Sequence, residues 1–232
     1  MTSGPGVCFL VHGESKSGKT WLGASGAAPV LILDAEGGTR FLPYQIVQWD
    51  GMSEPPAPGD WQVCIVPVRS YATMQSVYQW LNSGRHPFNT VVIDSLSEVQ
   101  QRCIDGLAGQ SQMTQQGWGD LLRQMSALVR SFRDLVTHPT RPISAVVLIA
   151  MTREINGRRV PYVQGQLAVT LPYYIDVVGY YYTHVDEQGI LGRRLWVSPN
   201  SLFDAGDRTG ALGDVVDNPT ITSMLNTIYR RG

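Results

Sequence analysis

The sequence contains few cysteines, almost no lysine and no long apolar run. Its 3 cysteines lie far apart in 232 residues and form no C-x-x-C pair, so we expect neither a disulfide framework nor a zinc site. No apolar stretch approaches the roughly 18 to 20 residues that a membrane-crossing helix needs. The first residues also lack the basic region of a signal peptide. These absences predict a cytoplasmic protein that makes no membrane contact.

Charge is also scarce and nearly balanced. Only 16% of the residues are charged and the net charge is -1 at pH 7, which argues against a protein that coats nucleic acid by bulk electrostatics. Any contact with nucleic acid must therefore come from a local patch. The only two lysines are Lys16 and Lys19, and a compositional bias toward arginine explains why there are no others. Both lie in one short glycine-containing segment.

The length of 232 residues and the hydrophobic fraction of 43% suit a single globular domain, residues 1–232, with a large core. Short apolar runs alternate with segments of helical periodicity. We expect strands near residues 7–12, 29–34, 61–68, 90–94, 142–151, 175–182 and 193–197, and helices near 19–25, 71–82, 96–107, 120–136 and 219–229. This order predicts an α/β fold with a mostly parallel central sheet flanked by helices, followed by late antiparallel strands.

Residues 13–20, GESKSGKT, match the phosphate-loop pattern G-x-x-x-x-G-K-[ST] at each fixed position. The glycines let backbone N–H groups approach phosphate oxygens, the lysine reaches the β and γ phosphates, and the threonine ligates Mg²⁺ at a helix start. A chance glycine-rich turn is the competing interpretation, but a strand precedes the segment and a helix follows it. We therefore predict that ATP and Mg²⁺ are bound by Gly13, Glu14, Ser15, Lys16, Ser17, Gly18, Lys19 and Thr20, with Lys19 also acting in catalysis.

Two acidic residues follow predicted buried strands. The carboxyl ends of parallel strands meet at one edge of a sheet, so Glu36 is a candidate base for the water that attacks the γ-phosphate. The alternative for Glu36 is a loop acid that faces solvent. Asp94 ends the apolar run 90–94, TVVID, and is predicted to hold Mg²⁺ through a bound water, with Ser95 beside it.

Polar and basic residues follow the next predicted buried strand. Thr152 lies at its end, where the hydroxyl is a candidate sensor of the γ-phosphate with a catalytic role. Arg153, Arg158 and Arg159 are candidate contacts to the phosphates of DNA, and Tyr162 is a candidate for stacking on a base. An ordinary solvated hairpin is the competing interpretation, because arginine is usually exposed.

Three later arginines are candidates for acting in trans, on the nucleotide of a neighbouring subunit. Arg193 and Arg194 stand at the start of a late strand, and Arg208 lies in a polar loop. Arginine fingers of other nucleotide hydrolases act in this way. Surface salt bridges are an equally good interpretation of all three.

Residues 106–119, GLAGQSQMTQQGWG, are polar, rich in glycine and uncharged. Such a segment has little apolar surface to bury. We expect it to pack poorly and to be mobile until something binds it.

These motifs together resemble the RecA-like ATPase core, in the phosphate loop, in LILDAEGG at 31–38 and in VVIDS at 91–95. The sequence is still more similar to the phage-encoded RecA-like nucleotide-binding proteins associated with single-strand annealing. That similarity covers nearly the whole chain, including LPYYIDVVGYYY at 171–182 and DRTGAL at 207–212. The chain departs from full RecA in having no N-terminal polymerisation arm and a short second loop.

The resemblance implies that Glu36 activates water, that Asp94 binds the metal, and that segments 106–117 and 153–165 are two DNA-contacting loops. It further implies a Mg²⁺-dependent ATPase that forms a homo-oligomer, binds single-stranded DNA and promotes recombination or annealing. A single-strand binding protein is a further candidate partner.

Two rival functions stay open at this point. A scaffold or regulatory ATPase would use the same nucleotide site and act on protein partners without binding DNA. A small-molecule kinase is less favoured, because the sequence shows no lid with clustered arginines for an acceptor.

Overall fold

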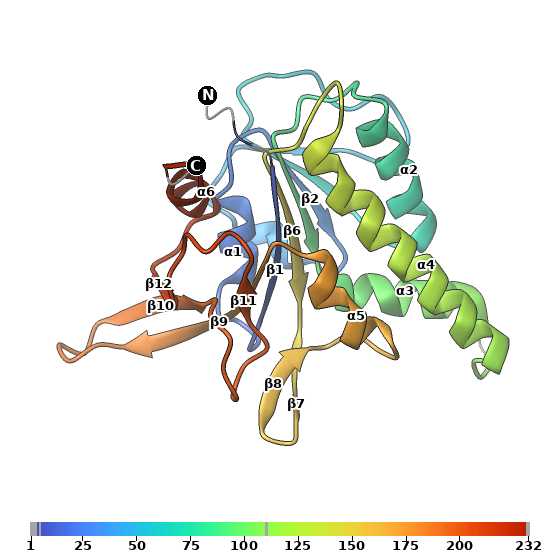
Figure 1. Ribbon diagram of the computed structural model, residues 1–232. Helices are drawn as coiled ribbons and strands as arrows, with labels where there is room; N and C mark the ends of the chain where they lie inside the picture. The colour runs from blue at the N-terminus through green and yellow to red at the C-terminus, as the bar shows by residue number, and fades with distance from the viewer. Residues whose placement is uncertain (1–3, 5, 110, 231–232) are drawn as a thin grey trace.

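The computed structural model describes residues 4, 6–109 and 111–230, most of which surround a single mixed sheet (Figure 1). The strand order is β12-β10-β9-β1-β6-β5-β2-β4-β3, and β11 pairs with β9 outside this path. The strands from β9 to β3 in this order are parallel to their neighbours, whereas β10 and β11 are antiparallel to β9 and β12 is antiparallel to β10. The predicted α/β class, with a mostly parallel sheet and late antiparallel strands, is confirmed.

The elements have the following bounds. The strands of the main sheet are β1 (Val7–Gly13), β2 (Val30–Asp34), β3 (Ile46–Gln48), β4 (Val63–Pro67), β5 (Thr90–Asp94), β6 (Ala145–Ala150), β9 (Val177–Val185), β10 (Leu191–Trp196), β11 (Gly206–Asp207) and β12 (Val215–Asp217), and β7 (Thr152–Ile155) pairs with β8 (Arg158–Pro161). The helices are α1 (Lys19–Ala24), α2 (Tyr71–Asn82), α3 (Leu96–Ala108), α4 (Gln115–Asp134), α5 (Leu167–Tyr174) and α6 (Ile221–Arg230), with 3-10 turns η1 (Gly38–Phe41) and η2 (Leu135–Thr137).

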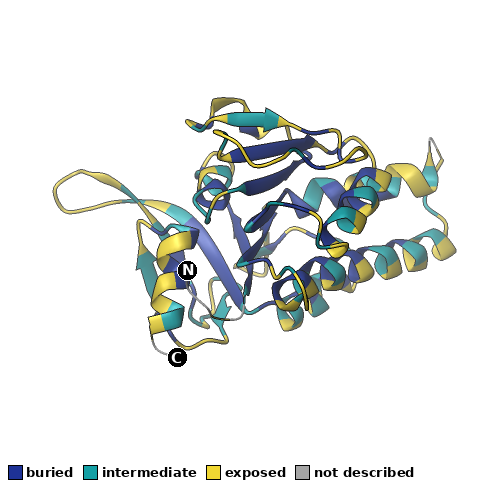
Figure 2. Cartoon of the chain, turned by 90° about the horizontal axis from the view of Figure 1, so that it is seen from above, coloured by how far each residue is buried: buried dark blue, intermediate teal, exposed yellow. Residues whose placement is uncertain are grey.

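The central strands are buried on both faces because nearly every residue in them is apolar. In β1 every residue is buried, and alternate side chains enter different clusters. Cys8 and Leu10 pack with α2 to α5 on one face, whereas Phe9 and Val11 pack with α1 and α6 on the other. Figure 2 shows these buried strands between helices whose outer faces are exposed.

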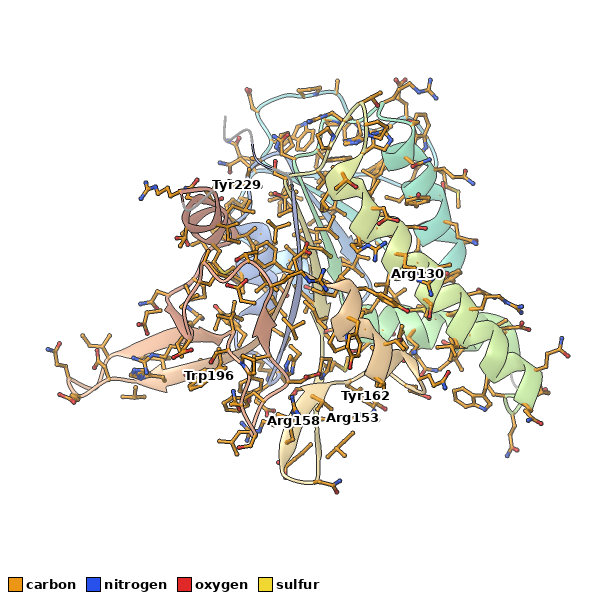
Figure 3. The ribbon with its side chains drawn as sticks, in the orientation of Figure 1. Arg130, Arg153, Arg158, Tyr162, Trp196 and Tyr229 are labelled. Carbon is orange, nitrogen blue, oxygen red and sulfur yellow. The ribbon has the colours of Figure 1, made fainter. Side chains whose placement is uncertain are left out.

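Two antiparallel hairpins extend from the carboxyl-end side of the sheet (Figure 1). The first, β7–β8, turns at Asn156 and Gly157, which both have positive φ. Figure 3 shows Arg153, Arg158 and Tyr162 at this hairpin. The second consists of β9 and β10. Both hairpins start where strands end at the edge that carries the phosphate loop.

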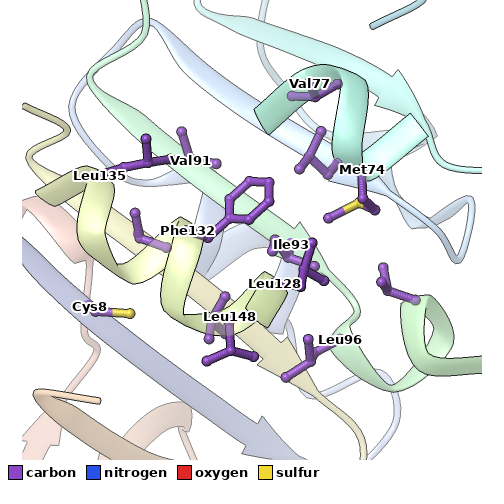
Figure 4. Packing of buried hydrophobic residues seen from close by; sticks show 14 of the residues in the cluster. Cys8, Met74, Val77, Val91, Ile93, Leu96, Leu128, Phe132, Leu135 and Leu148 are labelled. Atoms are coloured by element: carbon purple, nitrogen blue, oxygen red, sulfur yellow. The ribbon is translucent and has the colours of Figure 1, made fainter. Parts of the chain in front are cut away.

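The core beneath α4 includes side chains from α4, β5 and β6 (Figure 4). Leu128 and Phe132 lie one helical turn apart on α4 and are buried against the sheet. Val91 and Ile93 face them from β5, and Leu148 faces them from β6. This packing fixes β5 and β6 next to each other, and the residues that follow those two strands belong to the candidate site.

The segment 106–119, expected to pack poorly, is largely helical and packs in part on the core. α3 continues to Ala108 and α4 begins at Gln115, while position 110 lies outside the described residues. The Thr114 side chain accepts a hydrogen bond from Gly117 N at 3.0 Å and caps α4. The partly buried Met113 packs on the main core cluster. Capping and packing therefore outweigh the poor helix propensity of the glycines.

α5 is a helix that the sequence did not predict. It contains Pro172 and the adjacent β-branched residues Val169 and Thr170, which disfavour helix in isolation. Leu167 and Leu171 are nonetheless fully buried. Across the part of the chain that the structure describes, no helix is both long and apolar enough to span a membrane.

Candidate functional site

Four parallel strands end side by side at one edge of the sheet. β1 neighbours β6, β6 neighbours β5, and β5 neighbours β2. The register pairs Asp34 with Asp94 and Asp94 with Ile149, and it pairs His12 with Ala150. The residues that follow these strands therefore meet at one place, as expected for a ligand site in this class of sheet.

The loop between β1 and α1 has the backbone geometry of a phosphate cradle. A Cβ at Gly13 would lie 2.1 Å from the carbonyl oxygen of Tyr181, and Gly18 and Lys16 have φ of 101° and 62°. The Lys19 Nζ donates to the carbonyl oxygens of Gly13 and Glu14 at 2.9 and 2.7 Å. These geometries place the ammonium group over the loop, where a phosphate would sit.

Two further features of the loop fit an anionic ligand. The Ser17 Oγ is buried and has no hydrogen-bond partner within the described residues. Burial lowers the pKa of Lys19, whereas Glu36, Asp94 and Glu14 raise it. Phosphate oxygens would supply both the missing partner of Ser17 and a counter-charge for Lys19.

A cavity of about 510 Å³ opens over this loop. It collects residues from all four strand ends and from one late strand. The lining residues are Gly13, Glu14, Ser15, Lys16, Gly18, Lys19, Thr20, Trp21, Glu36, Gly38, Asp94, Met151, Thr152 and Arg193. The predicted phosphate-loop residues thus line the same cavity as Glu36, Asp94 and Thr152, except for Ser17, which lies buried within the loop.

Thr20 and Asp94 are the residues able to hold Mg²⁺. The Thr20 hydroxyl donates to Asp94 Oδ2 at 2.6 Å, so both oxygens lie at one point beside the loop. Burial is the main cause that raises the pKa of Asp94 to about 6, and the Thr20 hydrogen bond opposes the shift. The described residues hold no group of three or more His, Cys, Asp and Glu side chains able to bind a metal. This small set of hard oxygen donors suits Mg²⁺, which keeps waters and nucleotide oxygens as its other ligands.

Glu36 is held toward the cavity by two contacts. Its carboxylate accepts a hydrogen bond from the Ser95 hydroxyl, and Ser95 also caps α3. The segment before η1 is ordered by Asp34, whose Oδ1 accepts from the backbone N–H groups of residues 36, 37 and 38 at 3.2, 2.7 and 3.3 Å. Asp34 Oδ2 also accepts from the Thr39 hydroxyl at 2.5 Å. The Glu36 side chain therefore projects from a rigid turn rather than from a loose loop.

Thr152 connects the cavity to the interior. The His12 Nε2 lies 2.8 Å from the Asp204 carbonyl oxygen, so it must carry the proton, and Nδ1 accepts. The Thr152 hydroxyl lies 3.1 Å from His12 Nδ1 and 3.2 Å from the Val160 carbonyl oxygen. One hydroxyl proton serves two acceptors, so a third acceptor in the cavity would compete with both.

Ser97 joins the start of α3 to both stems of the β7–β8 hairpin. Its hydroxyl accepts from Met151 N at 3.0 Å and donates to the Tyr162 carbonyl oxygen at 2.6 Å. Asp94 lies only three residues earlier in the chain. The base of the hairpin is thus attached directly to the element that follows the candidate metal ligand.

The hairpin arginines have partners within the chain. Arg158 forms an ion pair with Asp204 at 3.1 Å. The Arg159 Nη1 donates to the Tyr180 hydroxyl at 2.7 Å, and its Nε lies 3.8 Å from a carboxylate oxygen of Glu14 in the phosphate loop. The guanidinium of Arg153 lies 5.5 Å from the centre of the Tyr162 ring.

The three later arginines lie in different surroundings. Arg194 pairs with Asp217 at 2.6 Å and Arg208 pairs with Asp176 at 3.3 Å, as in the salt-bridge interpretation. Arg193 instead lines the nucleotide cavity of its own chain, and its Nε donates to the Ser17 carbonyl oxygen at 3.2 Å. The position expected to act on a neighbouring subunit is therefore found beside the loop of the same subunit.

Three residues of the site were not predicted from the sequence: Asp34, His12 and Trp21. Asp34 had a visible signal, because an aspartate followed by short glycine-rich sequence often accepts hydrogen bonds from the next backbone N–H groups. Trp21 follows Thr20 directly, lines the cavity and is 51% exposed. His12 had no local signal, because its partners Thr152 and Asp204 are distant in sequence.

We expect His12 to make stability depend on pH. Burial lowers the pKa of His12 from 6.5 to about 4, so between these values the unfolded chain takes up a proton that the native chain does not. The stability of the wild type relative to His12→Gln should fall by up to about 1.4 kcal/mol per pH unit as the pH drops through this range. Urea unfolding of both proteins between pH 7 and 4.5 measures this difference in the free energy of unfolding. The contributions of the other titrating groups cancel in the difference because both proteins contain those groups. A difference in stability that does not change with pH would contradict a lowered pKa of His12 in the native protein.

Comparison with known proteins agrees with this geometry. A model of the AAA domain family matches residues 6–209 of the chain. Comparison with curated proteins gives no match. Among solved structures, the chain is similar to an ATPase from the type III secretion system of pathogenic bacteria, with 15% identity and a TM-score of 0.48. That likeness covers 76% of this chain and 52% of the other, so the chain spans about half the length of that ATPase. Because the family match extends over most of its length, the chain belongs to the AAA domain family and has a P-loop ATPase core.

Proposed function

We propose that the protein hydrolyses ATP in a Mg²⁺-dependent reaction at the cavity over the phosphate loop. The observation that supports this most directly is the convergence of Lys19, Thr20, Asp94 and Glu36 on one cavity from separate strand ends. An ammonium group, two oxygens able to bind a metal and a carboxylate able to accept a proton are the groups that in-line attack of water on a γ-phosphate requires.

Each residue has a distinct role in the proposed reaction. Lys19 leaves its two carbonyl partners and neutralises charge on the β and γ phosphates. Glu36, oriented by Ser95, accepts a proton from the attacking water. Thr20 and Asp94 would hold Mg²⁺, which would neutralise charge on the nucleotide oxygens. The backbone N–H groups of the loop bind the remaining phosphate oxygens.

We further propose that the nucleotide state controls the β7–β8 hairpin. Thr152 lies in the cavity at the start of β7, and its hydroxyl is shared between His12 and the Val160 carbonyl oxygen of β8. A γ-phosphate that accepts from Thr152 would weaken one of these bonds. Arg159 provides a second connection, because its partner Glu14 belongs to the phosphate loop.

The proposed ligand of the hairpin is single-stranded DNA, bound by a homo-oligomer that promotes phage-type recombination or annealing, with a single-strand binding protein as a candidate partner. Arg153, Arg158 and Arg159 would contact DNA phosphates, and Tyr162, 39% exposed, would stack on a base. Arg158 would exchange its ion pair with Asp204 for a phosphate contact. Because Arg158 would bind either Asp204 or DNA, a change at the nearby nucleotide site could alter the affinity for DNA.

Arg158→Ala tests the DNA proposal with little effect on the nucleotide site. We expect weaker binding of a single-stranded oligonucleotide in the presence of a non-hydrolysable ATP analogue. The affinity should decrease less steeply with salt. The plot of log affinity against log salt concentration should become shallower by about 0.7, because one phosphate contact is lost. Arg230→Ala on α6 makes the same charge change away from the hairpin and should leave the slope unchanged. Equal slopes for wild type and Arg158→Ala, or affinity that is independent of nucleotide, would refute this part of the proposal.

A scaffold or regulatory ATPase that acts on protein partners is the second candidate, favoured by exposed apolar side chains. Val169 and Tyr173 lie four residues apart on α5 and are 68% and 75% exposed. Val185, Ile190 and Leu191 are exposed at the end of the β9–β10 hairpin. ATP turnover with no measurable affinity for DNA in either nucleotide state would favour this function over the first.

A further inference from the structure

Arg193 enters the phosphate-loop region from a strand that carries none of the predicted catalytic groups. Its Nε donates to the Ser17 carbonyl oxygen at 3.2 Å. A Cβ added at Gly18 would lie 2.9 Å from the same Nε and 3.5 Å from Cζ, so the guanidinium packs against the bare glycine backbone. Arg193 also lines the cavity that holds Lys19 and Thr20. A contact this close lets the guanidinium reach a phosphate bound to the loop.

The backbone of Arg193 is fixed on both sides. It pairs with Thr183 of β9, and its N–H donates to Asn218 Oδ1 at 3.1 Å. Its carbonyl oxygen accepts from Asn218 N at 2.7 Å. Because successive strand residues point to opposite faces, the neighbouring Arg194 points away and pairs with Asp217. Arg193 is thus positioned by the sheet and does not depend on a mobile loop.

Arg193 also differs from Arg194 and Arg208 in its charged neighbours. Arg194 and Arg208 each have a carboxylate within 4.0 Å, whereas Arg193 forms no ion pair with any carboxylate in the described residues. Its one side-chain hydrogen bond in the structure leaves most of its five N–H donors for a ligand. Phosphate is the anion that best matches a planar guanidinium beside a phosphate loop.

The strand order decides which part of the nucleotide Arg193 would contact. β10 and β9 lie on one side of β1, while β6, β5 and β2 lie on the other. Asp94 and Glu36 follow β5 and β2, so the residues that would hold the metal and orient the attacking water lie on that second side. Arg193 approaches the loop from the other side of β1 and contacts the loop backbone at Ser17, so the guanidinium is placed beside loop-bound phosphates.

We propose that Arg193 binds the phosphates of a nucleotide held by its own subunit, on the flank of the loop that faces away from Glu36. This inference rests on the proposed ATP site and specifies how that site recognises its substrate. Arg193 is then a binding residue for ATP and ADP alike, since it contacts the phosphates that both nucleotides share. It does not act across a subunit boundary.

Arg193→Gln tests this proposal while retaining an N–H group that can donate to Ser17. The affinities for ATP and for ADP, measured with fluorescent nucleotide analogues, should both fall by about tenfold or more. The loss in turnover should appear in KM rather than in kcat. Arg230→Gln makes the same charge change on α6 and should bind as the wild type does. Unchanged affinity, or a loss confined to kcat, would overturn the proposal.

A mixing experiment separates action within a subunit from action across subunits. Lys19→Ala retains Arg193, and Arg193→Gln retains Lys19. If Arg193 acted on a neighbour, mixing the two variants at saturating protein would restore turnover above the sum of the separate activities. We expect no such gain. Normal ATP binding by Lys19→Ala would refute the ATP site itself, whereas a defect in Lys19→Ala together with normal binding by Arg193→Gln would refute only the present inference.

Discussion

Replacing Glu36 with glutamine should lower ATP turnover by about 10²- to 10⁴-fold while ATP binding is retained. Glutamine preserves the length of the side chain and can still accept a hydrogen bond from Ser95, but it cannot take a proton from water. Asp34 holds the turn in the same way in both proteins, because its acceptors contact only backbone N–H groups and Thr39. The loss should therefore appear in the chemical step.

Phosphate release under saturating Mg²⁺ and ATP measures this effect. Glu54→Gln is a suitable control, because it makes the same chemical change in the surface loop between β3 and β4. It should turn over ATP at the wild-type rate. If Glu36→Gln retained wild-type turnover, Glu36 would be a solvent-facing acid and the base would have to be sought elsewhere in the cavity.

Replacing Lys19 with alanine should weaken ATP binding by about 10- to 150-fold, as expected when a charge-assisted contact worth about 1.5 to 3 kcal/mol is removed. Lys19 is the only lysine whose ammonium group donates to the loop carbonyl oxygens in the described structure. Turnover should fall further, because charge accumulates on the transferred phosphate as the bond breaks. Titration calorimetry with Mg²⁺-ATP gives the affinity, and a thermal melt shows whether the variant is folded. An unchanged dissociation constant in a folded variant would contradict the role of Lys19.

The sequence was informative where local pattern and burial agree. The helix expected at 71–82 is found as Tyr71–Asn82, because Met74, Val77 and Leu81 form a buried stripe at helical spacing. The strand expected at 90–94 is Thr90–Asp94, a continuous apolar run buried on both faces. In both segments the local pattern and the packing in the fold favour the same structure, so the pattern is sufficient.

The sequence was misleading where long-range packing overrides local preference. Positions 115–119 contain two glycines yet form the first turns of α4, because Thr114 caps the helix and the following residues pack on the core. α5 forms around Pro172 because Leu167 and Leu171 are buried between neighbouring elements. The Thr114 cap is a local contact, but the packing of both helices on the core involves residues distant in sequence and cannot be read from nearby residues.

The site also contains both residues that local motifs predict and residues that only long-range packing brings together. The phosphate loop and Asp94 follow motifs with fixed spacing, so their residues could be named in advance. The role of Arg193 depends on β9 and β10 folding back beside β1, which brings Arg193 within hydrogen-bond distance of Ser17, 176 positions earlier in the chain. Similarly, His12 and Thr152 meet across 140 positions of sequence. Geometry of this kind is set by the sheet order and is not visible in any short segment.

The most direct test of the account is to identify the nucleotide that stays bound after incubation with Mg²⁺-ATP and rapid gel filtration. The wild type should retain ADP, Glu36→Gln should retain ATP, and Lys19→Ala should retain neither. This pattern follows if the triphosphate is held by the phosphate loop and hydrolysed with the help of Glu36. Recovery of ADP from Glu36→Gln, or of equal nucleotide from Lys19→Ala and the wild type, would contradict it.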